Sequence, residues 1–246
     1  MRKLSGITAL ILAGGMGTRL REAVSDRPKV LAPVNGRPFL ASLLDRLADA
    51  GVRRVVLCTG YLAHQVTEAF KAEFRGMQLL YSREEEPLGT GGALRLALPL
   101  LRCDPVLVLN GDSFCDADLG AFLRQHLEAG SPASLVLTRV ADVARYGSVE
   151  TDPAARVLSF SEKGARSGEG TINAGIYLLS RGVLEGIPAG KAVSLEREVF
   201  PELIGRGLHA FAGGSRFIDI GVPADYHAAQ AYLSDSPCRI AQGEAS

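Results

Sequence analysis

Three glycines directly after an apolar run constrain this chain more than any other feature of its sequence. The run from Ile7 to Leu12 has the length and composition of a buried β-strand, and Gly14, Gly15 and Gly17 follow it. Glycines let the backbone turn sharply and bring its N–H groups against a phosphate, because no side chain blocks the approach. Their spacing matches neither the dinucleotide fingerprint nor the Walker motif. We therefore predict a phosphate-binding loop of another kind after the first strand.

Two basic residues strengthen this prediction. Arg19 lies just beyond the glycines, and its guanidinium can hold phosphate oxygens in a bidentate fork. Lys29 follows Pro28 and supplies a compact second positive charge. A sharp turn after a strand would explain the glycines alone, but it would not explain both cations.

The stretch Gly14-Gly15-Met16-Gly17-Thr18-Arg19-Leu20 and the pair Pro28-Lys29 resemble the signature of the sugar-1-phosphate nucleotidyltransferases. The resemblance continues to about Leu233. It implies that Arg19 and Lys29 are the catalytic cations at the reacting phosphates. It also implies that the first strand end and the glycine loop bind the nucleotide, through Leu12, Ala13, Gly14, Gly15, Gly17 and Thr18.

Strand-like and helix-like segments alternate through the first half of the chain, which predicts a mostly parallel, mixed sheet covered by helices on both faces. With the resemblance, this gives an α/β fold of three layers, Rossmann-like and of the GT-A-like nucleotidyltransferase kind. The expected strands are Ile7–Leu12, Arg54–Cys58, Gln78–Tyr81, Val106–Leu109 and Leu135–Leu137, and the expected helices are Phe39–Ala50, Leu62–Phe70, Gly91–Leu98 and Leu119–Ala129.

After about residue 138 the pattern changes to short β-like pieces and turns. We expect a mixed extension of the same sheet, with strands at 147–150, 156–161, 171–179, 209–212 and 216–220 and a final helix at 224–232. One domain, 1–233, would hold a nucleotide-binding part, about 1–138, and a sugar-binding part, about 139–233. Residues 234–246 form a polar tail with the composition of a disordered end.

Two aspartates are candidate metal ligands. Asp112 follows the buried run Val106–Leu109, and Asp219 interrupts an apolar strand, where an unpartnered charge is costly. Carboxylate oxygens suit Mg²⁺, which fills the rest of its shell with phosphates and water. Because ligands bind beyond the carboxyl ends of parallel strands, we add Asn110 and Gly111 to the nucleotide site. Each aspartate could alternatively cap a turn or a helix, but the resemblance favours the Mg²⁺ site.

The resemblance assigns two further sets of residues. Glu162, Asn173 and Gly175 would bind the sugar and Lys163 its phosphate, although Gly164 stands where relatives carry proline after the lysine. A loop holding the base would include Glu86, Gly89 and Thr90. The acidic Glu84 and Glu85 before it are interpreted as solvated charges. Surface ion pairs are the alternative interpretation of Glu162 and Lys163.

The balance of 27 basic and 27 acidic residues gives no field that would attract nucleic acid or an anionic membrane. The absence of a signal-peptide pattern and of metal-like or paired cysteine spacing predicts a cytoplasmic protein with reduced thiols. The expected partners are small molecules, an NTP and a sugar 1-phosphate. A homo-oligomer is left open.

The implied reaction transfers a nucleoside monophosphate from an NTP to a sugar 1-phosphate and releases pyrophosphate. The C-terminal half, with the stretches Ser194–Pro201 and Phe217–Tyr226, resembles the D-glycero-D-manno-heptose 1-phosphate guanylyltransferases most. This resemblance implies GTP and an enzyme of surface-glycan synthesis that feeds lipopolysaccharide or capsule. Alternatives are a mannose 1-phosphate guanylyltransferase and an N-acetylmuramate 1-phosphate uridylyltransferase. From other classes come a non-catalytic nucleotide-sugar-binding subunit, which would tend to lose Arg19 or Lys29, and a glycosyltransferase using the D-x-D spacing of Asp116 and Asp118.

Overall fold

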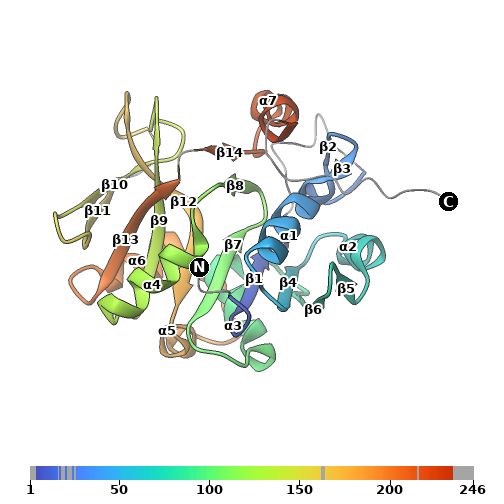
Figure 1. Cartoon of the computed structure of the whole chain (residues 1–246), viewed down its shortest axis with the longest axis horizontal. Helices are drawn as coiled ribbons and strands as arrows, with labels where there is room; N and C mark the ends of the chain where they lie inside the picture. The colour runs from blue at the N-terminus through green and yellow to red at the C-terminus, as the bar shows by residue number, and fades with distance from the viewer. Residues whose placement is uncertain are drawn as a thin grey trace.

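The computed structural model describes residues 4–15, 17, 20, 24, 26–161, 164–214 and 216–234. Its centre is an eight-stranded mixed sheet (Figure 1). Four neighbouring strand pairs are parallel and three are antiparallel, as the mostly parallel prediction requires. In spatial order the strands are β13 (Leu208–Gly214), β9 (Ala133–Val140), β12 (Gly170–Leu179), β7 (Val106–Asn110), β1 (Thr8–Leu12), β4 (Arg54–Thr59), β6 (Met77–Arg83) and β5 (Glu73–Phe74).

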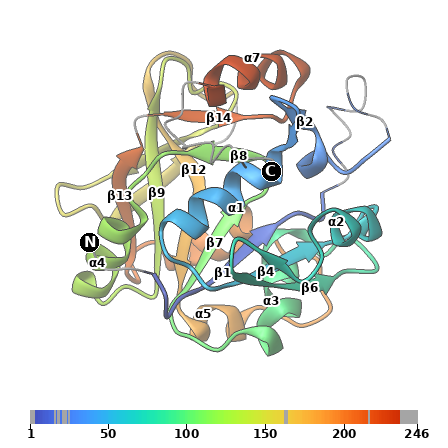
Figure 2. The same ribbon diagram turned by 45° about the vertical axis from the view of Figure 1, so that its right-hand side comes forward.

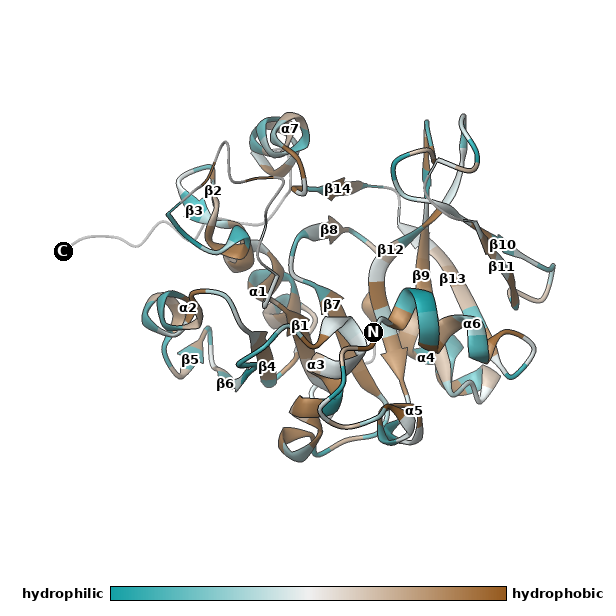
Figure 3. Cartoon of the chain, turned by 180° about the vertical axis from the view of Figure 1, so that it is seen from behind, coloured by the Kyte–Doolittle hydropathy of each residue, from teal (hydrophilic) through white to brown (hydrophobic). Residues whose placement is uncertain are grey.

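Helices cover both faces of the sheet, because its strands are apolar on both sides. Ile11 of β1 packs into one core cluster and Leu10 into the other. Figure 2 shows α1 lying across the sheet, and Figure 3 shows the hydrophobic colour concentrated in the strands. The first cluster takes side chains from α1 (Phe39–Asp49), α2 (Ala63–Phe70), α4 (Leu119–Ala129) and α7 (Pro223–Ser234), and the second from α3 (Gly89–Ala97), α5 (Arg181–Gly186) and α6 (Phe200–Leu203).

Three two-stranded sheets lie outside the main one. They pair β10 (Ser148–Thr151) with β11 (Val157–Ser161), β8 (Ser113–Cys115) with β14 (Phe217–Asp219), and β2 (Pro33–Val34) with β3 (Arg37–Pro38). The prediction that the second half simply extends the main sheet is therefore correct for β12 and β13 and wrong for β10, β11 and β14. The last three are antiparallel partners of local or distant strands, a pairing that the alternation of apolar residues does not specify.

Short helical segments connect these elements. The described residues form two 3₁₀ turns, η2 (Lys29–Leu31) and η3 (Leu98–Leu100), and one π-helix, η4 (Leu195–Val199). The helix α3 begins at Gly89, two residues before its predicted start, so Gly89 and Thr90 belong to its first turn and not to a loop.

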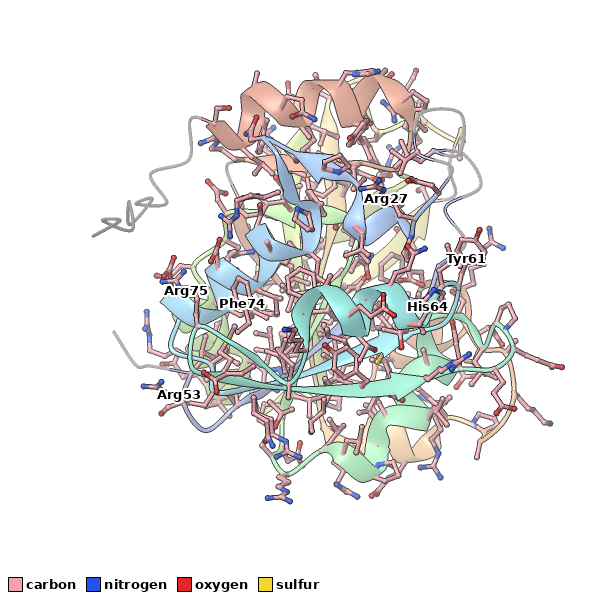
Figure 4. All side chains as sticks on the ribbon, turned by 90° about the vertical axis from the view of Figure 1, so that its right-hand side faces the viewer. Arg27, Arg53, Tyr61, His64, Phe74 and Arg75 are labelled. Atoms are coloured by element: carbon pink, nitrogen blue, oxygen red, sulfur yellow. The ribbon has the colours of Figure 1, made fainter. Side chains whose placement is uncertain are left out.

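The edge of the sheet at β5 is fastened to the helices beside it. Figure 4 labels Phe74 and Arg75 at this edge. The ring of Phe74 lies 5.8 Å from that of Phe70 in α2, between centroids. The Arg75 guanidinium contacts Asp45 and Asp49 of α1 at 3.0 and 2.9 Å. Among the described helices, none has the length and apolar character to span a membrane.

The proposed single domain over 1–233 and its two parts stay a prediction, although β12 of the second part lies between β9 and β7 of the first.

Candidate active site

Lys29 lies between the two aspartates that the sequence nominated as metal ligands. Its Nζ is 2.8 Å from Oδ2 of Asp112 and 3.7 Å from Oδ1 of Asp219. The lysine side chain is only 11% exposed, against 43% and 28% for the two carboxylates. Three residues predicted separately for catalysis and metal binding thus form one charged cluster at the end of β7.

Pairing of β8 with β14 brings the two aspartates together across the sequence. Asp219 lies opposite Ser113 in this small antiparallel sheet. The N–H of Ile220 donates to the backbone oxygen of Asp112 at 2.9 Å, and the N–H of Gly221 donates to Oδ1 of Asp219 at 2.6 Å. These backbone contacts hold the two aspartates next to each other, and one of them also holds the carboxylate of Asp219.

The environment of Asp219 disfavours its negative charge. Burial raises the pKa of this carboxyl group, and the negative charge of Asp112 raises it further, whereas Lys29 lowers it. Two repelling carboxylates that converge on one cation form a hard-oxygen donor set of the kind that binds Mg²⁺. The described residues hold no cluster of three or more His, Cys, Asp or Glu side chains that could enclose a metal. A metal here would therefore need further ligands from substrate, and the residues fit that arrangement.

Close backbone approach explains two of the glycines around this cluster. The Gly111 N–H donates to the Leu12 oxygen at 3.0 Å, and a Cβ on Gly111 would lie 2.5 Å from that oxygen. Gly17 has a φ of +58°, and a Cβ there would lie 3.1 Å from the Cβ of Lys29. The strand end and the glycine loop thus pack directly against the segment that carries the cluster.

Glu84 lies closer to the glycine loop than the sequence suggested. A Cβ on Gly14 would lie 2.4 Å from its Oε1, and one on Gly60 would lie 2.8 Å away. The other carboxylate oxygen accepts a hydrogen bond from the Leu88 N–H at 3.1 Å. Glu84 is half-buried, and burial raises its pKa. The interpretation of Glu84 as a solvated charge is therefore wrong, because two residues without side chains make room for its carboxylate beside the loop.

A cavity of about 400 Å³ opens beside the charged cluster. Five predicted site residues line it: Asn110, Asp112, Asn173, Gly175 and Asp219. Sequence reasoning gave no site role to several other lining residues, namely Tyr146, Ser148, Ser161, Tyr177, Glu196, Arg197 and Phe217, although the last three fall in the stretches that carry the heptose resemblance. They come from β10, β11, β12, β14, η4 and the segment before β10, and no local sequence signal marks them as one group.

The remaining predicted residues are placed as follows. Leu12 ends β1, and the Ala13 N–H donates to the Cys58 oxygen at 2.8 Å, while Gly15 and Glu86 are exposed. Thr90 is held within the protein, because its hydroxyl donates to Glu196 and accepts from the Leu195 N–H, both at 2.8 Å. Thr18, Arg19, Glu162 and Lys163 lie outside the described residues, so their predicted roles stay predictions.

Comparison with known proteins decides the family. The model of the nucleotidyl transferase family matches residues 8–236. The chain belongs to the nucleotidyl transferase family. The prediction drawn from the glycine loop and the two cations is thereby confirmed at the level of family, and the α/β fold described above is the fold of its solved relatives.

Two sequence relatives of this nucleotidyl transferase differ in length. A D-glycero-α-D-manno-heptose 1-phosphate guanylyltransferase from Aneurinibacillus thermoaerophilus is 36% identical over 226 residues, which cover 92% of this chain and 97% of the relative. A mannose-1-phosphate guanylyltransferase from Mycobacterium tuberculosis is 40% identical over 228 residues, 89% of this chain. The chain spans only 62% of the length of that second relative.

The crystal structure of HddC from Yersinia pseudotuberculosis has a TM-score of 0.83 with this chain at 36% identity, covering 92% of this chain and 99% of HddC. A second crystal structure of HddC, complexed with GMP-PN, gives a TM-score of 0.82 at 37% identity. The nucleotidyl transferase fold of this chain therefore matches a solved relative over nearly its whole length.

Proposed function

We propose that this nucleotidyl transferase transfers GMP from GTP to D-glycero-α-D-manno-heptose 1-phosphate, forming the GDP-sugar and pyrophosphate. The observation that carries the proposal is the cluster of Lys29, Asp112 and Asp219 beside a cavity large enough for a phosphorylated sugar. The near full-length match to a heptose 1-phosphate guanylyltransferase supports the choice of substrates.

The reaction is an in-line displacement at the α-phosphorus of the nucleotide. An oxygen of the sugar phosphate forms the new bond to phosphorus, the bond between the α-phosphorus and its bridging oxygen breaks, and pyrophosphate leaves with that electron pair. The attacking phosphate is already ionised, so no general base is required. Positioning and charge neutralisation supply the catalysis, because two polyanions must approach each other.

Lys29 would contact the α-phosphate, and Arg19 would hold the leaving phosphates. Nucleotidyl transferases typically use a divalent metal. We propose Mg²⁺ held by Asp112 and Asp219, where it would offset phosphate charge. Substrate phosphates would then compete with the carboxylates for Lys29, releasing its Nζ from the 2.8 Å contact with Asp112.

The glycine loop and the cavity would take the two substrates. The loop through Gly14, Gly15 and Gly17 would bind the nucleotide phosphates through its N–H groups. The cavity, with Asn173 and Gly175 on its wall, would hold the sugar. Glu162 and Lys163 would bind the sugar and its phosphate.

Glu84 is the proposed acceptor for the base. Guanine presents N–H donors at its edge, and an ionised carboxylate only accepts hydrogen bonds. The Glu84 carboxylate lies against Gly14 and Gly60, at the end of the sheet where the nucleotide is expected. Glu86, chosen from the sequence for this region, is exposed.

Transfer to mannose 1-phosphate is the second candidate, because the relative with 40% identity carries that name. Pyrophosphate release should therefore be measured with GTP, ATP, UTP and CTP against the heptose 1-phosphate, mannose 1-phosphate and N-acetylmuramate 1-phosphate. The proposal predicts that GTP with the heptose 1-phosphate has the highest kcat/KM. A higher value with mannose 1-phosphate would favour the second candidate, and a higher value with UTP would contradict guanylyl transfer.

A further inference from the structure

A chain of hydrogen bonds connects the first turn of α3 with the wall of the cavity, and Glu196 is its centre. Oε2 of Glu196 accepts from the Thr90 hydroxyl at 2.8 Å and from the Ser194 hydroxyl at 3.0 Å. Oε1 accepts from the Tyr177 hydroxyl at 3.2 Å. Glu196 lies on the π-helix η4, a rare conformation that is frequent at functional sites.

The two hydroxyls on Oε2 are fixed as donors to the carboxylate. The Thr90 oxygen already accepts the Leu195 N–H at 2.8 Å, and the Ser194 oxygen accepts the Arg197 N–H at 3.2 Å. Each hydroxyl therefore has its own hydrogen available for Glu196. An ionised carboxylate accepts hydrogen bonds and cannot donate them, so the hydroxyl of Tyr177 must also donate to it.

This direction determines what the phenol oxygen of Tyr177 can do next. With its hydrogen committed to Glu196, the oxygen can only accept. Asn173 Nδ2 donates to it at 2.9 Å. Burial raises the pKa of the Tyr177 phenol, and the nearby side chain of Asn110 lowers it, as a donor to the phenol oxygen does. A Cβ on Gly175 would lie 2.8 Å from Asn110 Nδ2. Because Gly175 has no side chain, there is room for this amide. Both asparagines thus direct their NH₂ groups toward Tyr177.

The two amide oxygens then differ. Oδ1 of Asn173 accepts the Gly175 N–H at 2.9 Å. Oδ1 of Asn110 is buried and has no hydrogen-bond partner within the described part of the chain. A buried acceptor without a donor is costly, and Asn110 lines the cavity together with Asn173. The network therefore leaves one unpaired acceptor on a residue that lines the cavity, and it fixes the identity of that acceptor as an oxygen.

We propose that Glu196 is a positioning residue that, through Tyr177, orients Asn110 so that its Oδ1 accepts a hydrogen bond from a hydroxyl of the sugar 1-phosphate. The inference rests on the proposed function and adds a specificity determinant to it. The sugar is the source of the hydroxyl because the cavity that Asn110 lines is also walled by Asn173, Tyr177 and Glu196. The sequence assigned no role to Tyr177 or to Glu196, although Glu196 lies in the stretch Ser194–Pro201 that carries the heptose resemblance.

The test compares wild type, Glu196→Gln and Tyr177→Phe with D-glycero-α-D-manno-heptose 1-phosphate and each of its monodeoxy derivatives, at saturating GTP. We expect wild type to favour the parent sugar over one derivative by about tenfold or more in kcat/KM, because that derivative leaves the acceptor unpaired. The glutamine amide can donate to the Tyr177 hydroxyl, so the direction of that hydrogen bond is no longer fixed. Phenylalanine has no hydroxyl and removes the hydrogen-bonded link between Glu196 and Asn110. Both variants should reduce the preference to less than about threefold, mainly through KM for the parent sugar.

Glu202→Gln is the matched control, since Glu202 is exposed on α6 and should keep the wild-type preference. Thermal unfolding of each variant separates a loss of fold from a loss of discrimination. GTP and its 2′- and 3′-deoxy forms make a second arm, in which the variants should match wild type. Retained sugar preference in Glu196→Gln, or a change only in the deoxynucleotide arm, would overturn the inference. A wild type that releases pyrophosphate from none of these sugars would instead overturn the proposed function.

Discussion

Lys29 and Asp112, 83 positions apart in the sequence, contact each other at 2.8 Å. Lys29 is held on η2 directly after Pro28, while Asp112 lies between β7 and β8. The ion pair is partly buried, so solvent screens it less than a surface pair. The ion pair keeps the Lys29 ammonium at the place where phosphates and a metal would meet. Before substrate binds, Asp112 would be the partner that balances the charge of Lys29.

Replacing Lys29 with methionine should lower kcat by about a hundredfold or more, because the proposed function requires its charge to neutralise the reacting phosphates, and methionine keeps the side-chain length without the charge. The measurement is pyrophosphate release at saturating substrates. Arg124→Gln removes a charge from an exposed position of α4 and should have the wild-type rate. A Lys29→Met enzyme with near-normal turnover would remove this residue from the reaction. The corresponding prediction for Arg19→Ala is the same loss.

The two aspartates should separate metal binding from folding. Asp112→Asn and Asp219→Asn should each abolish Mg²⁺-dependent turnover, since the amide retains the shape but not the charge that binds a hard cation. Asp219→Asn should also unfold at a higher temperature than wild type in EDTA, because burial and Asp112 both disfavour the Asp219 charge. A normal Mg²⁺ titration at full rate would show that the substituted residue is structural.

Local patterns predicted the parts of this molecule that local physics determines. Alternation of apolar runs with helical periodicity gave the longer strands and the helices of the first half, because burial on both sheet faces requires that pattern. It missed the short strands β2, β3, β5 and β8, which have too few residues to show a period. Asp112 was found for the same reason, as a carboxylate at the end of a buried strand. The position of Asp219 beside it depends on the pairing of β14 with β8, between segments about a hundred residues apart.

The cavity was harder to predict because its wall is assembled from distant segments. Glu196 and Tyr177 meet only when η4 packs against β12, and a glutamate near a chain turn looks like any solvated charge in the sequence. Glu84 was misjudged for a related reason, since its burial depends on Gly14 and Gly60 leaving room for it. Predictions that fall on Thr18, Arg19, Glu162 and Lys163 keep the support of the motif alone.

Gly111→Ala should destabilise the protein by about 2–4 kcal/mol, because its Cβ would lie 2.5 Å from the Leu12 backbone oxygen and strand ends must move apart. Urea unfolding measures this change. Gly186→Ala is the control, since a Cβ there meets no atom within 4 Å and the residue ends the helix α5. Equal stability of the two variants would show that the contact between β1 and Gly111 tolerates a side chain.

Glu84→Gln should reduce the preference for GTP over ATP and UTP by about tenfold, because the amide places a donor beside the donors of guanine. Competition between pairs of nucleotides in one reaction measures the ratio directly. Glu85→Gln is the neighbouring control, as Glu85 is exposed. An unchanged ratio in Glu84→Gln would show that this carboxylate does not contact the base.

The same Glu84→Gln substitution should stabilise the protein at neutral pH. Burial raises the pKa of Glu84 above its ordinary value of 4.5, so the folded state holds this proton to a higher pH than the unfolded state does. Below pH 4.5 the carboxyl group is neutral in both states and costs little. As the pH rises through the folded pKa, the unfolded state gains from ionisation and wild type loses stability relative to the variant. Urea midpoints of the two proteins should therefore agree near pH 4 and diverge by pH 7, with the variant higher. A constant difference across that range, or a less stable variant at pH 7, would mean that the Glu84 charge is not penalised by its place beside Gly14.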